Sequence, residues 1–169
     1  MTKVAFLLAN DYEDSEMKNP YDSIVEAGYE TVIIGLEKGI ECKGKKETVS
    51  YLTDLAVADA DASDFDAVII PGGSAPEELR VNEDVIKFVK ELNNKSAVIA
   101  GICHGPQVMI SADILRGHEV TCYQGIRDDV KNGGAKYINE EVVVSQNIIT
   151  SRTPKDEPAF IREILAKLN

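Results

Sequence analysis

The strongest constraint on the fold is a series of short apolar runs that alternate with segments of helical pattern. We expect buried strands at Val4–Ala9, Glu30–Leu36, Phe65–Ile70 and Ala97–Ala100, and helices at Ser15–Ala27 and Glu83–Asn93. Strands that are apolar along their whole length are typical of a parallel sheet covered on both faces. The pattern therefore predicts the α/β class, with a flavodoxin-like, doubly wound, mostly parallel sheet and helices on both faces.

The second half of the chain continues this pattern. Further strands are expected at Glu119–Tyr123, Val142–Ser145 and Ile148–Thr150, a last helix at Ala159–Leu168, and a small hairpin around 47–51. Pro20 interrupts the first helical segment and predicts either a kink or a late helix start near Asn19. No linker or repeat divides the 169 residues, so we expect a single domain over residues 1–169.

Composition and charge exclude several classes of function. The formal net charge is -11, which disfavours nucleic acid or an anionic membrane as a main partner, because both require clustered Lys and Arg. No apolar run approaches the roughly 18 residues of a membrane span, and the N-terminus lacks a secretory pattern. Three widely spaced cysteines, Cys42, Cys103 and Cys122, do not form a disulfide framework. These features predict a cytoplasmic protein with free thiols.

A single short motif points to chemistry. The apolar run that ends at Ala100 leads into Gly101-Ile102-Cys103-His104-Gly105, and a helical segment follows. Gly-x-Cys-x-Gly between a strand and a helix is the cysteine version of a nucleophile elbow, a turn too tight for side chains on both sides of the nucleophile. Free N–H groups at the helix N-terminus favour the thiolate. We predict that Cys103 is the activated nucleophile, although a buried structural cysteine is the common alternative. Cys42 and Cys122 lack such a frame and are expected to be non-catalytic.

Further candidates follow the carboxyl ends of other predicted strands, where ligands bind in sheets of this kind. Glu13 follows the first strand and is a candidate for proton transfer at the thiol, whereas helix capping explains Asp14 and Glu16. Pro71-Gly72-Gly73 follows the third strand, either as a plain turn or as an oxyanion pocket. His104 adjoins the nucleophile, but consecutive residues at a sharp turn usually point apart. Its backbone N–H is well placed to stabilise an oxyanion in either case.

Taken together, the motifs resemble the PfpI family of cysteine proteins, in the superfamily of intracellular proteases, protein deglycases, glyoxalase III chaperones and class I glutamine amidotransferases. The resemblance runs from about Lys3 to Leu168. Its segments are residues 9–14, 65–73, 75–77, 102–107, 123–129 and 151–154.

The resemblance implies a role for each matching position. Cys103 is the nucleophile, Glu13 is the buried acid that contacts it, and His104 pairs with Glu77 of a neighbouring subunit. Gly72, Gly73 and the His104 N–H form the oxyanion pocket, and Tyr123 lies near it. The resemblance therefore also implies a homo-oligomer with an active site near a subunit interface, and no metal or organic cofactor. An amidotransferase is disfavoured because no histidine follows His118.

Several functions remain open from the sequence. The main expectation is a cofactor-independent stress-protection enzyme that acts on small reactive aldehydes, on glycated or damaged proteins, or on peptides. The alternative is a redox-sensing stress protein or chaperone that uses an oxidisable Cys103. A third possibility is a structural relative that has lost activity.

Overall fold

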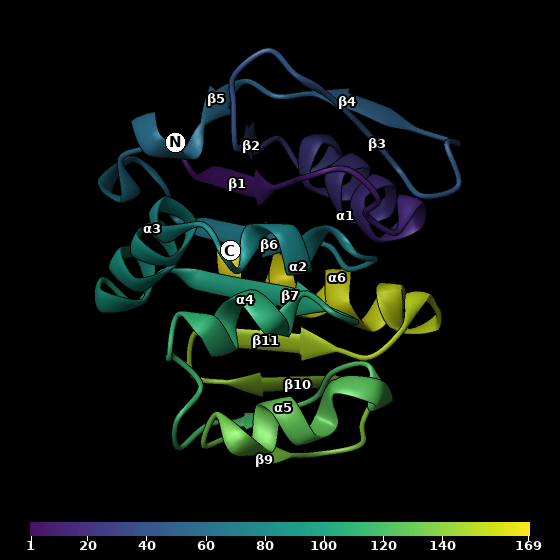
Figure 1. The fold of residues 1–169 in the computed structure, drawn as a ribbon, viewed down its shortest axis with the longest axis vertical. Helices are drawn as coiled ribbons and strands as arrows, with labels where there is room; N and C mark the ends of the chain where they lie inside the picture. Colours follow the sequence, from purple (N-terminus) through teal and green to yellow (C-terminus); the bar gives the residue numbers. More distant parts are fainter.

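The computed structural model describes residues 1–169 and is built on one seven-stranded sheet. The strand order is β10-β11-β7-β6-β1-β2-β5 (Figure 1). The strands are β1 Lys3–Leu7, β2 Glu30–Gly35, β5 Leu55–Ala56, β6 Ala67–Ile70, β7 Val98–Ile102, β10 Val142–Ser145 and β11 Ile148–Ser151. All neighbouring strands are parallel except the antiparallel pair of β10 and β11. The predicted fold class is therefore confirmed.

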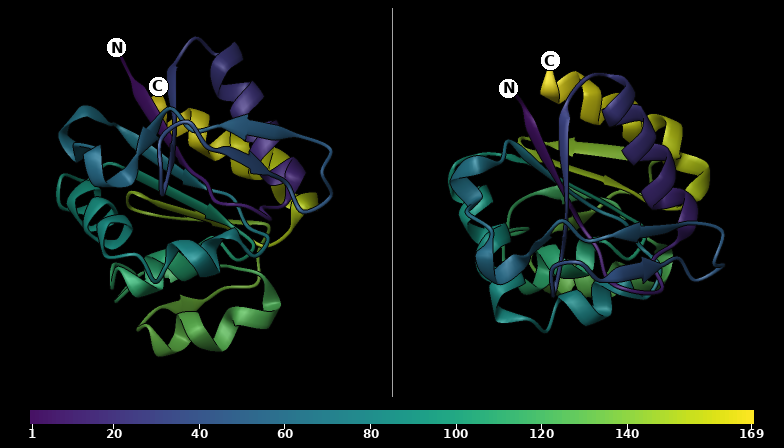
Figure 2. Two further views of the ribbon diagram at one scale, coloured as in Figure 1. Left: turned by 45° about the horizontal axis from the view of Figure 1, so that its top comes forward. Right: turned by 90° about the horizontal axis from the view of Figure 1, so that it is seen from above.

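Helices cover both faces of this sheet. They are α1 Asp14–Glu26, α2 Ala75–Leu79, α3 Glu83–Asn94, α4 Pro106–Ser111, α5 Arg127–Asn132 and α6 Glu157–Leu168. Helices α1 and α6 pack together on one face, while α2, α3 and α4 lie on the other, as the view from above in Figure 2 shows. None of the helices is long and apolar enough to cross a membrane.

Two small sheets and four 3₁₀ turns complete the chain. The hairpin of β3 Glu41–Lys43 and β4 Ser50–Leu52 follows β2, and β8 Glu119–Val120 pairs with β9 Lys136–Tyr137. The 3₁₀ turns are η1 Val57–Asp59, η2 Ala62–Asp64, η3 Gln124–Ile126 and η4 Pro154–Asp156.

Three local expectations need correction. The first helix begins at Asp14 and contains Pro20, so a late start was the wrong alternative; burial of that face, including Met17 and Ile24, compensates for the lost hydrogen bond. The predicted strand at 119–123 ends at Val120, because the N–H of Tyr123 donates to the carbonyl of Cys103 instead (2.9 Å). The hairpin near 47–51 exists, but its first strand begins earlier, at Glu41.

The strand order brings the predicted site segments together. Strand β6 lies between β1 and β7, and all three run in the same direction. The loops that follow them therefore meet at one edge of the sheet, beyond the carboxyl ends of the strands. These loops carry Glu13, Gly73 and Cys103, and all three residues line a common pocket.

Candidate active site

The Cys103 backbone has the strained conformation of a nucleophile elbow. Its φ angle is 63°, in the left-handed region that non-glycine residues rarely adopt, at a typical cost of about 1–3 kcal/mol. Strand β11 and the segment after β8 hold it there: the N–H of Cys103 donates to the carbonyl of Ser151 (3.0 Å), and its carbonyl accepts from the N–H of Tyr123 (2.9 Å). A Cβ at Gly105 would collide with the backbone of Ile70, which explains the glycine after the nucleophile.

The side chain of His104 reaches the nucleophile. Its Nδ1 atom lies 3.2 Å from Sγ of Cys103, although the two residues are consecutive. The ring stacks on Tyr123 with 4.8 Å between the ring centroids and an interplanar angle of 25°. Burial and the charge of Lys45 lower the pKa of His104, while Glu77 opposes this shift. At neutral pH the imidazole is therefore neutral, and it is placed to accept the thiol proton.

The resting state of Cys103 is the thiol, contrary to our expectation from the helix N-terminus. Burial, followed by the charge of Glu16, raises the pKa of the thiol to about 12. The N–H groups of His104 and Gly73 hydrogen-bond the sulfur and oppose this shift, but they are outweighed. The physical reason is that desolvation penalises the thiolate, and α4 has only six residues to counter it.

Glu16 is a buried acid beside the nucleophile. Its side chain is fully buried, its Oε1 accepts the N–H of Gly72 (2.9 Å), and its Oε2 has no hydrogen-bond partner. A Cβ at Gly72 would lie 2.5 Å from Oε1 of Glu16 and 2.8 Å from Cβ of Cys103, so only this glycine separates the two side chains. Burial raises the pKa of Glu16 to about 8, which leaves the carboxyl protonated at neutral pH.

The position that we expected for Glu13 is therefore occupied by Glu16. Glu13 lines the same pocket, but Lys45 and Lys46 bind its two carboxylate oxygens at 2.5 and 2.7 Å. Burial alone would raise the pKa of Glu13, yet these hydrogen bonds outweigh burial and lower it. The sequence pattern could not separate the two glutamates, because helix capping explained Glu16 equally well.

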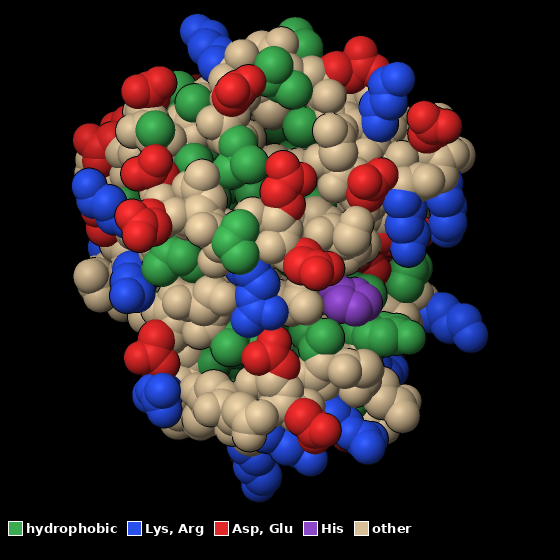
Figure 3. All heavy atoms as spheres, in the orientation of Figure 1, with side chains coloured by type: hydrophobic (Ala, Val, Ile, Leu, Met, Phe, Trp, Pro, Cys, Tyr) green, Lys and Arg blue, Asp and Glu red, His purple; other side chains and the backbone are tan.

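Lys45 is a pocket residue that the sequence analysis missed. It lies in the loop between β3 and β4, and Asp14 fixes this loop by accepting the N–H groups of Lys46 (3.0 Å) and Thr48 (2.9 Å). These hydrogen bonds overcome the effect of burial and lower the pKa of Asp14 to about 2. Asp14 is thus an anchor for the loop as well as the first residue of α1. Figure 3 shows basic side chains gathered over this hairpin, at the right-hand edge of the molecule.

The two glycines after β6 have different roles. The N–H of Gly72 is occupied by Glu16, so it is not available to an oxyanion as we had expected. The N–H of Gly73 instead faces the sulfur of Cys103. Gly73 has a φ of 77°, and a Cβ there would meet the backbone N of Glu13 at 2.5 Å. Gly73 and His104 therefore supply the two donors beside the nucleophile.

Glu77 and Tyr123 complete the catalytic pocket, a cavity of about 410 Å³ that also contains Cys103 and His104. Glu77 is exposed and lies in α2 of the same chain, and its side chain makes no hydrogen bond or ion pair within it. Tyr123 is 42% exposed and forms one wall through its stack on His104. The structure thus brings all the predicted site residues except Gly72 to one pocket, and the donation of Glu77 by a neighbouring subunit stays a prediction.

The remaining cysteines lie outside the catalytic pocket. All three cysteines are free, and Cys42 and Cys122 are buried with raised pKa values, through burial in each case. No group of three His, Cys, Asp or Glu side chains is placed to hold a metal ion.

Comparison with known proteins finds relatives that match nearly the whole chain. The model of the DJ-1/PfpI family matches residues 2–167. The chain is 50% identical over 165 residues to YraA of Bacillus subtilis, named as a proposed cysteine protease, with 96% of each chain covered. It is 41% identical over 167 residues to protein/nucleic acid deglycase 2 of Escherichia coli, covering 98% of this chain and 97% of the relative.

A solved structure agrees with these matches. A two-domain protein of Anabaena variabilis, with DJ-1/ThiJ/PfpI-like and ferritin-like domains, superposes with a TM-score of 0.98 at 41% identity. The match covers 99% of this chain and 48% of that protein, so this chain spans about half of its length. From the matched family model and the relatives of similar length, we conclude that the chain belongs to the DJ-1/PfpI family.

Proposed function

We propose that this protein is a cofactor-independent thiol enzyme that converts α-oxoaldehydes, free or as early adducts on proteins, to hydroxy acids. The observation that carries the proposal is the buried Glu16 carboxyl beside Cys103, protonated at neutral pH and with one oxygen unpartnered. A neutral acid next to a nucleophile suits the movement of protons within an adduct. The name of the deglycase relative supports the same substrate class.

The first step is addition of the thiol to the aldehyde carbon. When the aldehyde arrives as a hemithioacetal on a protein thiol, the C–S bond of that adduct breaks first in the pocket, and its hydroxyl proton moves to the departing sulfur, which restores the aldehyde. The proton of Cys103 moves to Nδ1 of His104, 3.2 Å from the sulfur, and a bond forms between sulfur and carbon. The carbonyl π electrons move onto oxygen, where the N–H groups of Gly73 and His104 stabilise the oxyanion. His104 then returns its proton to this oxygen. The product is a neutral hemithioacetal.

The second step moves hydrogen between the two substrate carbons. His104 removes the proton from the carbon bound to sulfur, while Glu16 protonates the oxygen of the neighbouring carbonyl. His104 then protonates the second carbon, and the hydroxyl on the first carbon returns its proton to Glu16. The result is a thioester of a 2-hydroxy acid, which water cleaves to the free acid and the Cys103 thiol. The cycle restores every side chain to its starting protonation state.

The test is lactate production from methylglyoxal. Cys103→Ala should lower the turnover by at least about 10³-fold, because a reaction loses most of its rate enhancement with its nucleophile. Cys42→Ala, which removes a buried thiol outside the catalytic pocket, is the matched control and should retain turnover. Full activity of Cys103→Ala would eliminate the proposal.

Peptide hydrolysis is the second candidate, and the contact between Cys103 and His104 favours it. Expulsion of an amine requires a protonated base, which His104 could supply if Glu77 were to pair with it. Cleavage of casein-derived peptides, absent in Cys103→Ala and in His104→Ala, would support this function in place of aldehyde conversion.

The redox-sensor alternative is less favoured by the electrostatics. Oxidation proceeds through the thiolate, and burial raises the pKa of Cys103. We therefore expect slow oxidation by peroxide at neutral pH, measurable by intact mass spectrometry.

A further inference from the structure

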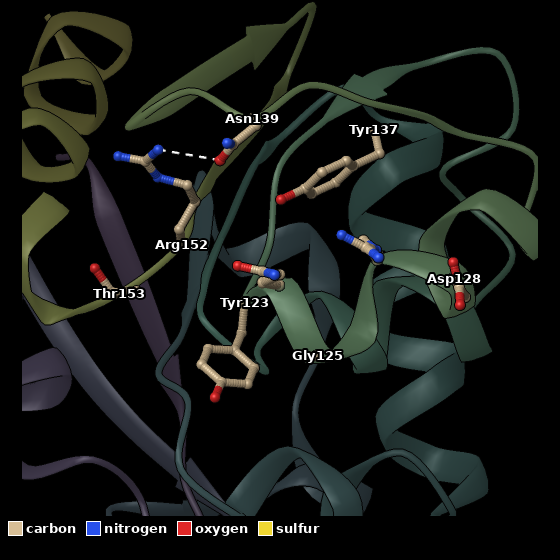
Figure 4. A pocket seen from close by; sticks show the side chains of 9 residues that line it. Tyr123, Gly125, Asp128, Tyr137, Asn139, Arg152 and Thr153 are labelled. Carbon is tan, nitrogen blue, oxygen red and sulfur yellow. Dashed lines mark hydrogen bonds between the residues drawn. The ribbon is translucent and has the colours of Figure 1, made fainter.

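A second, larger cavity adjoins the catalytic pocket and has no part in the chemistry described above. Its volume is about 740 Å³, and its walls come from η3, α5, β9 and the segments that follow β9 and β11. Figure 4 shows Tyr123, Tyr137, Asn139 and Arg152 around this space. The lining is mainly polar, so the cavity suits a ligand with many hydrogen-bonding groups.

The two cavities share part of their walls. Tyr123 and Thr153 line both of them, and the Tyr123 ring stacks on His104. Gly125 allows this arrangement, because a Cβ there would lie 2.8 Å from the Tyr123 ring. A substrate that fills the catalytic pocket therefore extends past Tyr123 into the larger cavity if it is bigger than a small aldehyde.

The two arginines of this cavity differ in whether another side chain already binds them. Arg152 is held by Asp156 through Nε and Nη2, both at 3.0 Å, and its Nη1 donates to Asn139 (3.1 Å), so its charge is already balanced. The side chain of Arg127 makes no hydrogen bond or ion pair, and the residue is exposed. Asp128, the one acidic residue of the lining, is also exposed, in the first turn of α5. No ion pair joins Arg127 to Asp128, so the Arg127 guanidinium is available to a ligand at the cavity wall.

The neutral groups of the cavity fit a polypeptide backbone. The side-chain amides of Gln124 and Asn139 and the hydroxyl of Tyr137 offer both donors and acceptors, as a peptide requires. A nucleic acid is a poorer fit, because phosphate binding relies on several uncompensated cations and this chain has a net charge of -11. Because the cavity has one arginine without an ion pair, it fits a ligand that carries one carboxylate.

We propose that this cavity binds the peptide portion of a substrate whose modified side chain enters the catalytic pocket, with Arg127 pairing to a carboxylate of that peptide. The proposal rests on the proposed function, because it assumes that Cys103 acts on an adduct carried by a polypeptide. It adds a peptide subsite and a preference for acidic neighbours of the modified residue.

The kinetic test compares two substrates of opposite charge. They are the hemithioacetals that methylglyoxal forms with the thiols of acetyl-Cys-Asp-Gly and acetyl-Cys-Lys-Gly. We expect the KM of the aspartate peptide to be about fivefold lower in the wild-type protein, the upper range for an exposed ion pair. In Arg127→Ala this ratio should fall to about one. Arg162→Ala removes an exposed arginine of α6 and should keep the wild-type ratio. Equal KM values in the wild-type protein would overturn the proposal, as would an unchanged ratio in Arg127→Ala.

A binding experiment separates this inference from the catalytic proposal. Backbone amide NMR of Cys103→Ala, titrated with acetyl-Ser-Asp-Gly, should show shifts at Gly125, Tyr137 and Asn139. Shifts without any methylglyoxal turnover by the wild-type protein would support the subsite and reject the proposed reaction. Turnover without these shifts would reject the subsite alone. A 5′-mononucleotide that shifts the same amides at lower concentration than the peptide would identify a phosphate site and overturn the peptide assignment.

Discussion

At the scale of single residues, the candidate site is a set of groups held in their neutral forms. Burial keeps the Cys103 thiol and the Glu16 carboxyl protonated, and it keeps the His104 imidazole unprotonated. Neutral groups cost less to bury than ions, and they exchange protons when a substrate arrives. Glu13 differs because two lysines stabilise its charge. The start of α1 thus carries two glutamates in opposite protonation states.

Removing the charge of Glu16 should make the thiol more acidic. In the wild-type protein the Glu16 carboxylate forms above about pH 8 and raises the pKa of Cys103. Glu16→Gln abolishes that repulsion while keeping an acceptor for the N–H of Gly72. We expect Glu16→Gln to be alkylated faster by iodoacetamide at pH 9 and to lose about 10²-fold in lactate production. Glu13→Gln is the control, because the charge of Glu13 is already paired with two lysines. An equal increase of the alkylation rate in that variant would contradict the assignment of Glu16 as the acid that raises the pKa of Cys103.

Glu16 should also make the stability of the fold depend on pH. Its pKa is about 8 in the folded chain and near 4.5 in the unfolded chain, so the folded state binds the extra proton between these values. The stabilisation is complete below pH 4.5 and is lost as the pH rises towards 8. The slope is about 1.4 kcal/mol of unfolding free energy per pH unit. Urea unfolding between pH 5 and 8 should show this decline for the wild type and a smaller decline for Glu16→Gln. If the unfolding free energies of the wild type and Glu16→Gln declined equally with pH, Glu16 would not be the cause of the decline.

At the scale of elements, the site depends on how closely strands and loops approach one another. The elbow after β7 passes against the end of β6, and the β3–β4 hairpin loop is fastened over the start of α1 by Asp14. Buried Tyr12 adds a second attachment, because its hydroxyl donates to the carbonyls of Cys42 and Val49, both at 3.1 Å. Lys45 reaches the catalytic pocket only because this loop is held in place.

The tight packing of the elbow predicts that one added methyl group lowers the stability of the fold. Gly105→Ala would place a Cβ against the carbonyl of Ile70 and 2.9 Å from the backbone N of Ile102, and neither can move without breaking the sheet. We expect a loss of about 2–3 kcal/mol in unfolding free energy, together with lost activity. Gly133→Ala meets a side chain at 3.3 Å and has a negative φ, so it should change stability by less than about 0.5 kcal/mol. Similar denaturation midpoints for the two variants would show that the elbow tolerates a side chain.

At the scale of the whole molecule, the order of the strands creates the site. Segments that are about 60 and 90 residues apart from Glu13 meet because β6 lies between β1 and β7. The mouth of the resulting pocket carries exposed Glu77 and partly exposed Tyr123. An unpaired carboxylate at this position is available to a second copy of the chain.

A mixing experiment tests whether the site is shared between subunits. In peptide cleavage, the candidate reaction that uses a pair of His104 and Glu77, Cys103→Ala and Glu77→Ala should each be inactive alone. Refolding them together should restore part of the cleavage if His104 of one subunit pairs with Glu77 of another. We expect partial rescue, because Glu77 has no partner within its own chain. A mixture of Cys103→Ala with His104→Ala, two changes in the same half-site, is the control and should give none. Absence of rescue in the first mixture would place the whole site within one chain.

Much of this protein could be predicted from local sequence. The apolar runs determined the strands because a strand covered on both faces has no polar position. The Gly-x-Cys-x-Gly motif determined the elbow because only glycine fits beside the strained Cys103. Both depend on neighbours in the chain, so a single sequence was sufficient for the fold class and for the position of the elbow.

Only the tertiary structure decided the electrostatics. Whether Glu13 or Glu16 is the buried acid depends on which of them meets Lys45 and Lys46, and these lie more than 25 residues away. Whether Cys103 rests as a thiol depends on burial by segments from three different loops. The pKa of a side chain depends on burial, charges and hydrogen bonds from every segment around it. A motif describes only a few consecutive residues, so the protonation states of the site could be assigned only from the fold.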